Sequence, residues 1–224
     1  WQYQAINTKG ESEFEVKVSS ADLLADATGD NVQLQTLSVT SSLGEVQAKG
    51  QIQLQADFPL QLNINADLNA LKQKETVLLP ATKANLTLSG TLKKQTALLL
   101  QTQGAIDAKL KAEAQLTAPK TPLNVKLAVA RGQYPFDGND PLSIKDVNLT
   151  INGDILTSQI QLNGAVSGMG IPANSLDLQA IGHLSNIEIH QLKLNALEGA
   201  AELKGDVNWR DGVEWNSHLQ LAKM

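Results

Sequence analysis

The sequence alternates between apolar and polar residues over long stretches, and this period of two restricts the fold more than any other feature. In residues 44–70, which read GEVQAKGQIQLQADFPLQLNINADLNA, nearly all even positions from Val46 onward are apolar or small. Nearly all odd positions are Gln, Lys, Asn or Asp. Successive side chains of a β-strand point to opposite faces of a sheet, so this period predicts two strands that each have one apolar and one polar face.

The same alternation continues along the chain, interrupted by turn-like stretches such as ATGD, TAPKTP and YPFDGNDP. The hairpins resemble one another only loosely, so we interpret residues 1–224 as one repetitive all-β segment without a strict repeat. Two stretches, 20–27 and 68–79, are candidates for short helical turns between strands. The pattern predicts about fifteen strands, at residues 2–8, 12–19, 31–41, 44–56, 59–70, 83–92, 95–103, 105–117, 122–131, 143–152, 154–163, 174–184, 186–195, 199–209 and 213–222.

In two of these strands the apolar residues switch between even-numbered and odd-numbered positions. The change occurs once within residues 32–39 and once within residues 187–194. A one-residue slip would turn the remaining side chains to the other face unless an extra residue restores the register. The sequence therefore predicts β-bulges near Thr36 and Gln191.

The continuous apolar face requires a partner of some kind. Fifteen strands at a spacing of ~4.8 Å would form a sheet roughly 70 Å long, and an open sheet of that size must curl, split or be covered. Because a large apolar face is a binding surface or a liability in water, we expect either a two-layer sandwich or a trough that holds something apolar. The residues expected to line this face are Val46, Ile52, Leu54, Leu60, Leu62, Ile64, Leu68, Leu86, Leu88, Ile106, Leu110, Leu116, Leu123, Val125, Leu127, Leu149, Ile151, Leu176, Leu178, Leu203 and Val207.

Charge and composition exclude several classes of protein. A formal net charge of −5, with 18 Lys and Arg residues, argues against a nucleic-acid binder. The chain has no cysteine, so it can form neither disulfides nor thiolate metal sites. No run of 18 apolar residues could cross a membrane as a helix. The sequence begins at Trp1 and ends within an alternating run, so we expect a segment of a longer protein whose export signal or membrane anchor lies outside it.

No arrangement of residues predicts catalysis, a cofactor or a metal. The histidines, His183, His190 and His218, fall on separate predicted strands. The DGND stretch at 137–140 is more typical of a turn than of a calcium loop, and the GMG stretch at 168–170 lacks the context of a phosphate-binding loop. We expect the lysines to lie on the polar face and to pair with Asp and Glu rather than with lipid headgroups. We therefore expect no enzyme.

The hairpin at residues 205–221 carries a family resemblance. It reads GDVNWRDGVEWNSHLQL, that is, G-x-V-x-W, a short turn, and W-x-x-x-L-x-L, and LNALEGAAELKG leads into it. The two tryptophans, Trp209 and Trp215, are expected to pair across this hairpin. A looser version, SVTSSLGEVQAKG, occurs at 38–50. These motifs, and the aromatic-poor alternation around them, resemble the TamB family of the translocation and assembly module and the wider AsmA-like group of bacterial envelope proteins.

The resemblance implies an elongated, taco-like curled sheet of mostly antiparallel, meandering strands with a hydrophobic interior groove. It implies a periplasmic segment of a protein that is anchored to the inner membrane outside this fragment. The implied partners are phospholipid, a TamA-type outer-membrane barrel of the Omp85 class, and unfolded outer-membrane protein clients. The family offers no catalytic residues to transfer to this sequence.

Three functions remain open on these grounds. The groove could shield acyl chains during phospholipid transport between the inner and outer membranes. The sheet edges could instead act as a chaperone or scaffold for the assembly of outer-membrane proteins such as autotransporters, by strand addition. A closed, adhesin-like β-sandwich would have a purely structural role. A transmembrane barrel is disfavoured because the strands lack the aromatic girdles that such barrels carry.

Overall fold

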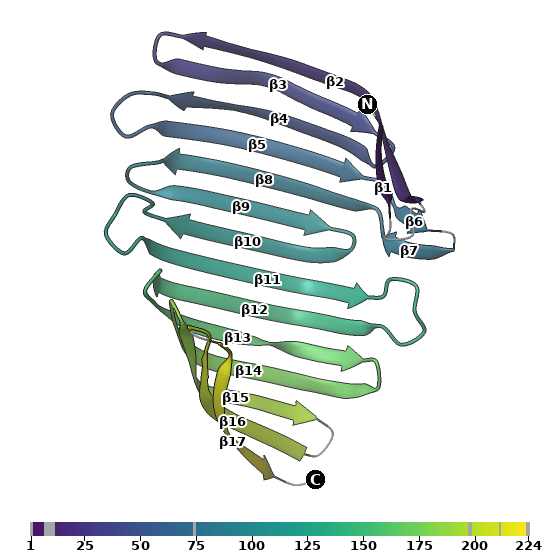
Figure 1. The fold of residues 1–224 in the computed structure, drawn as a ribbon, viewed down its shortest axis with the longest axis vertical. Helices are drawn as coiled ribbons and strands as arrows, with labels where there is room; N and C mark the ends of the chain where they lie inside the picture. The colour runs from purple at the N-terminus through teal and green to yellow at the C-terminus, as the bar shows by residue number, and fades with distance from the viewer. Residues whose placement is uncertain (1, 7–11, 74, 197–198, 211, 223–224) are drawn as a thin grey trace.

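The computed structural model describes residues 2–6, 12–73, 75–196, 199–210 and 212–222, and in this part of the chain it is built entirely from β-strands and turns (Figure 1). A fifteen-stranded antiparallel sheet runs the length of the molecule, and a two-stranded sheet stands at its margin. The strands are β1 (Gln2–Ile6), β2 (Ser12–Thr28), β3 (Asn31–Ser41), β4 (Gly44–Gln53), β5 (Pro59–Leu68), β6 (Leu71–Gln73), β7 (Thr76–Leu79), β8 (Thr82–Thr91), β9 (Thr96–Gln103), β10 (Ile106–Ala114), β11 (Pro122–Tyr134), β12 (Leu142–Asp154), β13 (Thr157–Gly168), β14 (Ile171–His183), β15 (Asn186–Ala196), β16 (Gly199–Asn208) and β17 (Glu214–Ala222).

The large sheet is a meander in which almost every strand pairs with its neighbours in the sequence. The order is interrupted only between β5 and β8, which pair directly while β6 and β7 form their own hairpin. Short connections between antiparallel neighbours produce this topology without crossovers. The predicted all-β sheet of about fifteen antiparallel strands is therefore confirmed.

The two predicted helical turns are wrong. Residues 20–27 belong to β2, which pairs with β3 as far as Thr28. Residues 68–79 contain the end of β5 and the β6–β7 hairpin. In both places the sequence also allows a strand, and pairing with an adjacent strand satisfies backbone groups that an isolated helical turn would leave without partners.

Both predicted bulges are confirmed. The register of β3 shifts between Leu34 and Leu37 against β4, and the register of β15 shifts between Ile189 and Leu192 against β16. Each bulge contains one extra residue, so the apolar side chains before and after it lie on the same face. A further irregularity occurs where the register shifts between Lys145 and Asn148 on β12.

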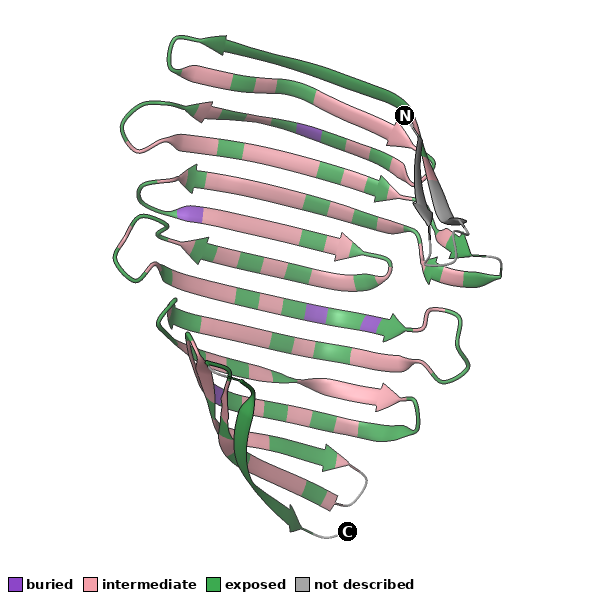
Figure 2. Ribbon diagram, viewed as in Figure 1, coloured by how far each residue is buried: buried purple, intermediate pink, exposed green. Residues whose placement is uncertain are grey.

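The large sheet is a single layer. All the substantial strand-to-strand contacts join hydrogen-bonded neighbours, and the described residues form no second sheet packed on the first. Figure 2 shows the consequence, since most of the ribbon is half-buried or exposed. The accessible surface is 14700 Å², whereas a compact monomer of 24.0 kDa would expose roughly 9,900 Å². The described chain is therefore not a closed β-sandwich.

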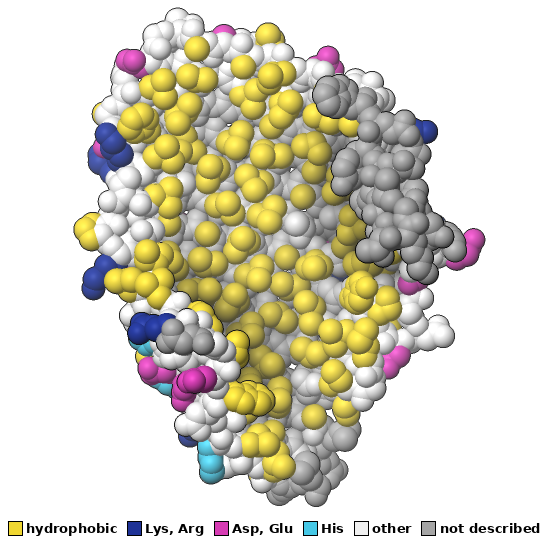
Figure 3. Space-filling view, viewed as in Figure 1, with side chains coloured by type: hydrophobic (Ala, Val, Ile, Leu, Met, Phe, Trp, Pro, Cys, Tyr) yellow, Lys and Arg dark blue, Asp and Glu magenta, His cyan; other side chains and the backbone are white. Residues whose placement is uncertain are grey.

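The sheet curls at its C-terminal end. One end of each of the strands β15–β17 bends over the face that Figure 1 turns toward the viewer. The same face is covered with hydrophobic side chains, and it is hollowed where these strands overhang it (Figure 3). The sheet is not closed into a barrel, so the apolar side remains accessible.

Candidate functional site

One apolar row crosses the sheet from β2 to β17 and forms the centre of the candidate site. Each member lies directly opposite the next member on the neighbouring strand, and at ~4.8 Å per strand the row extends over roughly 60 Å. Such directly opposed side chains shield one another on a sheet face. The row, called the central row below, consists of Leu23, Leu37, Ala48, Ile64, Leu86, Leu100, Leu110, Leu127, Leu149, Leu162, Leu178, Leu192, Leu203 and Leu219.

Further apolar rows flank the central row on both sides. One of them contains, for example, Leu62, Leu88 and Leu98 on β5, β8 and β9. Registers across the sheet bring all but two of the predicted lining residues onto this common face. The two others, Leu54 and Leu116, lie in turns beyond the ends of β4 and β10. These two residues and Ile106, which opens β10 on the apolar face, are each about half exposed.

Sequence reasoning missed several members of this face. Leu100 on β9 lies between Leu86 and Leu110, but three consecutive leucines hide the phase of its strand. The register shows that the middle one, Leu99, points to the polar side with Lys111 opposite it. Leu162 and Leu192 alternate cleanly with polar neighbours, so the same periodicity would have found them.

The apolar face is open rather than filled by the protein. Among the described residues the buried hydrophobic side chains are small or medium in size, namely Ala48, Val129 and Ala180, and no large side chain is fully buried. Hydrophobic groups gather over most of the face in Figure 3, from the upper strands to the overhang of β15–β17. A compact domain of this length would place its leucines inside a core. This molecule leaves them on one side of a single sheet.

The opposite face of the sheet carries amides and charges. Asn85 donates a hydrogen bond to Asn65 on the adjacent strand, and Lys83 pairs with Asp67 at 2.8 Å. The hydrogen bond that Lys83 donates to Asp67, together with the negative charge of Asp67, raises the pKa of Lys83. A hollow of about 960 Å³ lies on this side. Its lining combines Gln, Asn, Lys and Asp side chains with several alanines and Val129.

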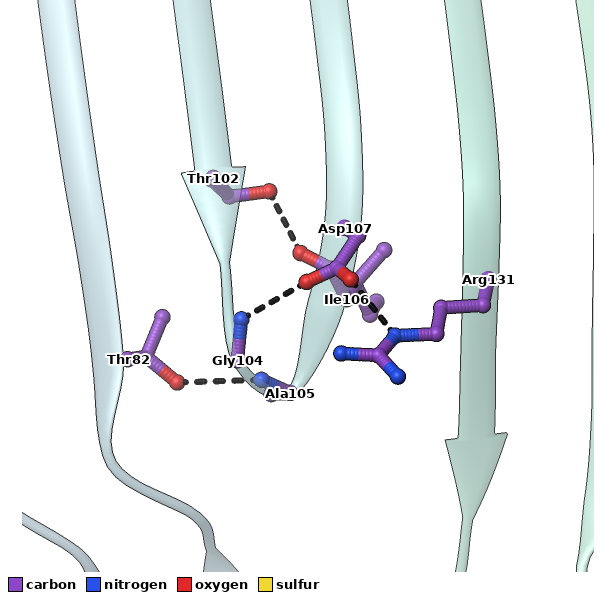
Figure 4. A network of polar contacts seen from close by, with 7 residues as sticks. All are labelled: Thr82, Thr102, Gly104, Ala105, Ile106, Asp107 and Arg131. Atoms are coloured by element: carbon purple, nitrogen blue, oxygen red, sulfur yellow. Dashed lines mark hydrogen bonds and ion pairs between the residues drawn. The ribbon is translucent and has the colours of Figure 1, made fainter.

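A polar network fixes the β9–β10 turn at one margin of the sheet (Figure 4). The Asp107 carboxylate accepts a hydrogen bond from the Gly104 N–H at 2.9 Å and pairs with Arg131 Nε at 2.5 Å. These two donors hold the pKa of Asp107 below its usual value, the Gly104 N–H having the larger effect. In the same turn, the Ala105 N–H donates to Thr82 Oγ1, which ties the turn to β8. The network fixes the backbone of this turn relative to β8 and β11.

The described residues form no cluster of His, Asp or Glu that could hold a metal ion. His183 and His190 lie 3.6 and 4.0 Å from Glu188, whereas His218 lies on β17. In the described part of the chain, the structure contains no helix suited to crossing a membrane.

The predicted aromatic pair of the last hairpin is wrong. Trp215 lies opposite Val207, not opposite Trp209, because the pairing of β16 and β17 places the turn closer to Trp209. Trp209 instead donates its indole N–H to the carbonyl oxygen of Leu184, at 3.2 Å. Asp211, which falls in the short turn expected between the two tryptophans, lies outside the described residues.

Comparison with known proteins connects this open sheet to a family. The family described as "TamB, N-terminal domain" matches residues 2–224, which is nearly the whole chain. The chain belongs to the TamB family. It is 44% identical over 226 residues to the translocation and assembly module subunit TamB of Haemophilus influenzae, covering 100% of this chain and 17% of that protein. The chain thus spans about a sixth of the length of this relative. No solved structure matches it.

Proposed function

We propose that the apolar face shields the acyl chains of phospholipids while they move along the molecule. The observation that carries the proposal is the uncovered central row, which continues across fourteen adjacent strands without an intervening charged residue. Each buried CH₂ group contributes about 0.8 kcal/mol, so moving a sixteen-carbon chain through water costs roughly 10 kcal/mol or more. A continuous apolar surface lowers that cost at every step.

The shape of the face also suits movement. Aliphatic side chains repeat at the spacing of the strands, so neighbouring positions offer an acyl chain similar contacts. A deep, specific pocket would hold the lipid at one position, because affinity gained at a single site must be lost again for the lipid to leave. The proposed role requires no catalytic step.

In the longer protein, we propose that this segment lies in the periplasm as part of a bridge between the membranes. The relative's name, translocation and assembly module subunit, supports a role in an assembly. The proposed partner at the outer membrane is an Omp85-type barrel of the TamA kind, and the proposed cargo is phospholipid. The anchor to the inner membrane would lie outside this segment.

A second candidate function rests on a different observation. Beyond Ser20 the outer edge of β2 pairs with none of the described strands, and Leu23 and Leu24 are exposed on its two faces. An unpaired edge of this kind can accept an extended segment of another chain through backbone hydrogen bonds. A chaperone or scaffold for unfolded outer-membrane proteins would use such an edge rather than the apolar face.

Substitution on the two faces of one strand tests the main proposal. Leu110 lies in the central row, and Lys109, its neighbour on β10, lies on the polar face. We expect Leu110→Asp to abolish or strongly reduce binding of phosphatidylethanolamine from vesicles, because a carboxylate on the apolar face must be desolvated when a lipid covers it. Lys109→Asp is the matched control and should bind lipid normally, and circular dichroism should show strand content unchanged in both variants.

Photocrosslinking identifies the face that is used. A photoreactive residue at even positions of 46–70 should capture lipid, whereas the same residue at odd positions should not. Equal capture from both faces, or normal lipid binding by Leu110→Asp, would contradict the proposal. Capture of unfolded outer-membrane protein at β2, without lipid on the apolar face, would favour the second candidate.

A further inference from the structure

The turns along one margin of the sheet are tied together into a continuous rim. They connect β4 to β5, β8 to β9, and β10 to β11, at residues 54–58, 92–95 and 115–121, and are called the lysine margin below. The Lys93 N–H donates to the carbonyl oxygen of Asp57 at 3.1 Å, and Thr117 Oγ1 donates to the carbonyl oxygen of Lys93 at 2.7 Å. The Ile155 N–H of the following turn donates to the carbonyl oxygen of Lys120 at 3.0 Å. These bonds hold the backbone of adjacent turns at fixed separations.

Two ammonium groups on the lysine margin have no anionic partner among the described residues. Lys94 pairs with Asp57 at 2.5 Å, but Lys93 and Lys120 make no ion pair with any residue that the structure describes. Lys93 Nζ lies 4.9 Å from the centre of the Phe58 ring, which holds it close to an apolar group. The margin therefore presents positive charge that the protein itself does not neutralise.

Apolar residues accompany these lysines. Leu54 and Leu116, the two predicted lining residues that lie in turns, are 50% and 52% exposed on this margin. The turns also adjoin the apolar face. Figure 3 shows basic side chains at the left margin of that face. Positive groups therefore stand beside exposed aliphatic groups, at the boundary between the apolar face and water.

The opposite margin differs in charge. Its β11–β12 connection contains Asp137 and Asp140, whose carboxylates accept hydrogen bonds from the N–H groups of Val77 and Gly170, both at 2.8 Å. An anionic head would be repelled by these two carboxylates and attracted to Lys93 and Lys120.

We propose that the lysine margin binds the phosphate headgroup of anionic phospholipids, with Lys93 and Lys120 as the ligands, while the acyl chains lie on the adjacent apolar face. This inference rests on the proposed function and adds to it a lipid class and an orientation. The strand lysines do not share this role. Lys109 and Lys126 point to the polar face, where the sheet separates them from any lipid on the central row. The register places Lys109 and Lys126 on the polar face, as expected, whereas Lys93 and Lys120 lie in turns.

Competition between two lipids tests the proposal. The 224-residue chain is incubated with vesicles of equimolar dioleoylphosphatidylglycerol and dioleoylphosphatidylcholine, and native mass spectrometry measures the ratio of the two lipids bound. The chain has a net charge of −5, so a preference for the anionic lipid requires a local positive site. We expect phosphatidylglycerol to be enriched, with each lysine contributing about fivefold at low salt.

The decisive comparison uses two double variants with the same change in charge. Lys93→Gln/Lys120→Gln should lose about 25-fold of the enrichment at low salt, fivefold for each lysine, and should bind phosphatidylcholine as before. Lys109→Gln/Lys126→Gln should retain the enrichment. Raising the salt concentration should reduce the preference of the unmodified chain, because exposed charges are screened.

Each outcome bears on a different claim. Equal binding of the two lipids by the unmodified chain would overturn the headgroup site and leave the acyl-chain function standing. Equal loss of preference in both double variants would show an effect of net charge alone and would also overturn the site. Failure of the chain to bind either lipid would contradict the proposed function itself.

Discussion

At the scale of single residues, the polar contacts at the sheet margins position turns rather than perform chemistry. Asp107 is an example, since it accepts from the Gly104 N–H and pairs with Arg131. Both donors stabilise the charged carboxylate, which is why its pKa lies below the ordinary value of 3.8. A group whose pKa is lower in the folded state stabilises that state above its unfolded pKa, and this stabilisation is lost as the pH falls through the folded pKa.

Asp107→Asn should therefore lower the free energy of unfolding modestly at pH 7, because the neutral amide loses the charge that attracts Arg131. As the pH falls through the folded pKa of Asp107 the unmodified carboxyl is protonated as well, so the difference in stability should shrink between pH 7 and pH 2. Urea denaturation monitored by circular dichroism at both pH values measures the difference. Asp22→Asn, which alters an exposed carboxylate on β2, is the control. A difference that persists unchanged at pH 2 would show that the charge of Asp107 is not its cause.

At the scale of strands, the sequence predicts much of the architecture because the sheet is a meander with one apolar face. Parity alone located the bulges on β3 and β15, since the apolar residues on either side of each bulge must share a face. The apolar residues also switch from an even-numbered position, Ile144, to odd-numbered positions from Val147 onward. The same reasoning therefore predicts the irregularity on β12. The extra length of β2 was partly predictable, because Ala21, Leu23, Ala25 and Ala27 alternate with polar residues and only Leu24 breaks the pattern. Pairing with β3 then fixes these residues as a strand.

The attachment of β17 to the sheet should depend on a glycine of β16. A Cβ atom at Gly205 would stand 2.1 Å from the carbonyl oxygen of Asn216 on β17, so even alanine requires the two backbones to separate. We expect Gly205→Ala to increase hydrogen exchange throughout residues 214–222 and to leave β8–β13 unchanged. Gly182→Ala is a milder control, since its nearest neighbour would be Ile160 Cδ1 at 3.1 Å, the flexible end of a side chain. Unchanged protection of β17 in Gly205→Ala would show that the edge adapts to the methyl group.

At the scale of the whole molecule, the candidate site is a property of the register and not of any local motif. Alternation identifies which residues of one strand are apolar, but only the pairing shows that Ile64, Leu86 and Leu100 stand in a line. The lysine margin is even harder to predict from the sequence. Lys93 and Lys120 are 27 positions apart in the chain, and they lie in adjacent turns that are joined by the hydrogen bond from Thr117 to Lys93.

A single-layer sheet in which each strand contacts only its neighbours should unfold from its ends. Interior strands such as β10 have two partners, whereas β17 has one and is exposed along its whole length. Stability in such an array is the sum of local and nearest-neighbour contributions, so a terminal strand can open without the rest. We expect amide hydrogen exchange to be slowest in β8–β13 and to become faster strand by strand toward β17, with the same gradient after tenfold dilution of the protein. Uniformly slow exchange at high concentration that is lost on dilution would mean that a second copy covers the apolar face. Uniformly slow exchange at both concentrations would contradict the open single layer on which lipid binding depends.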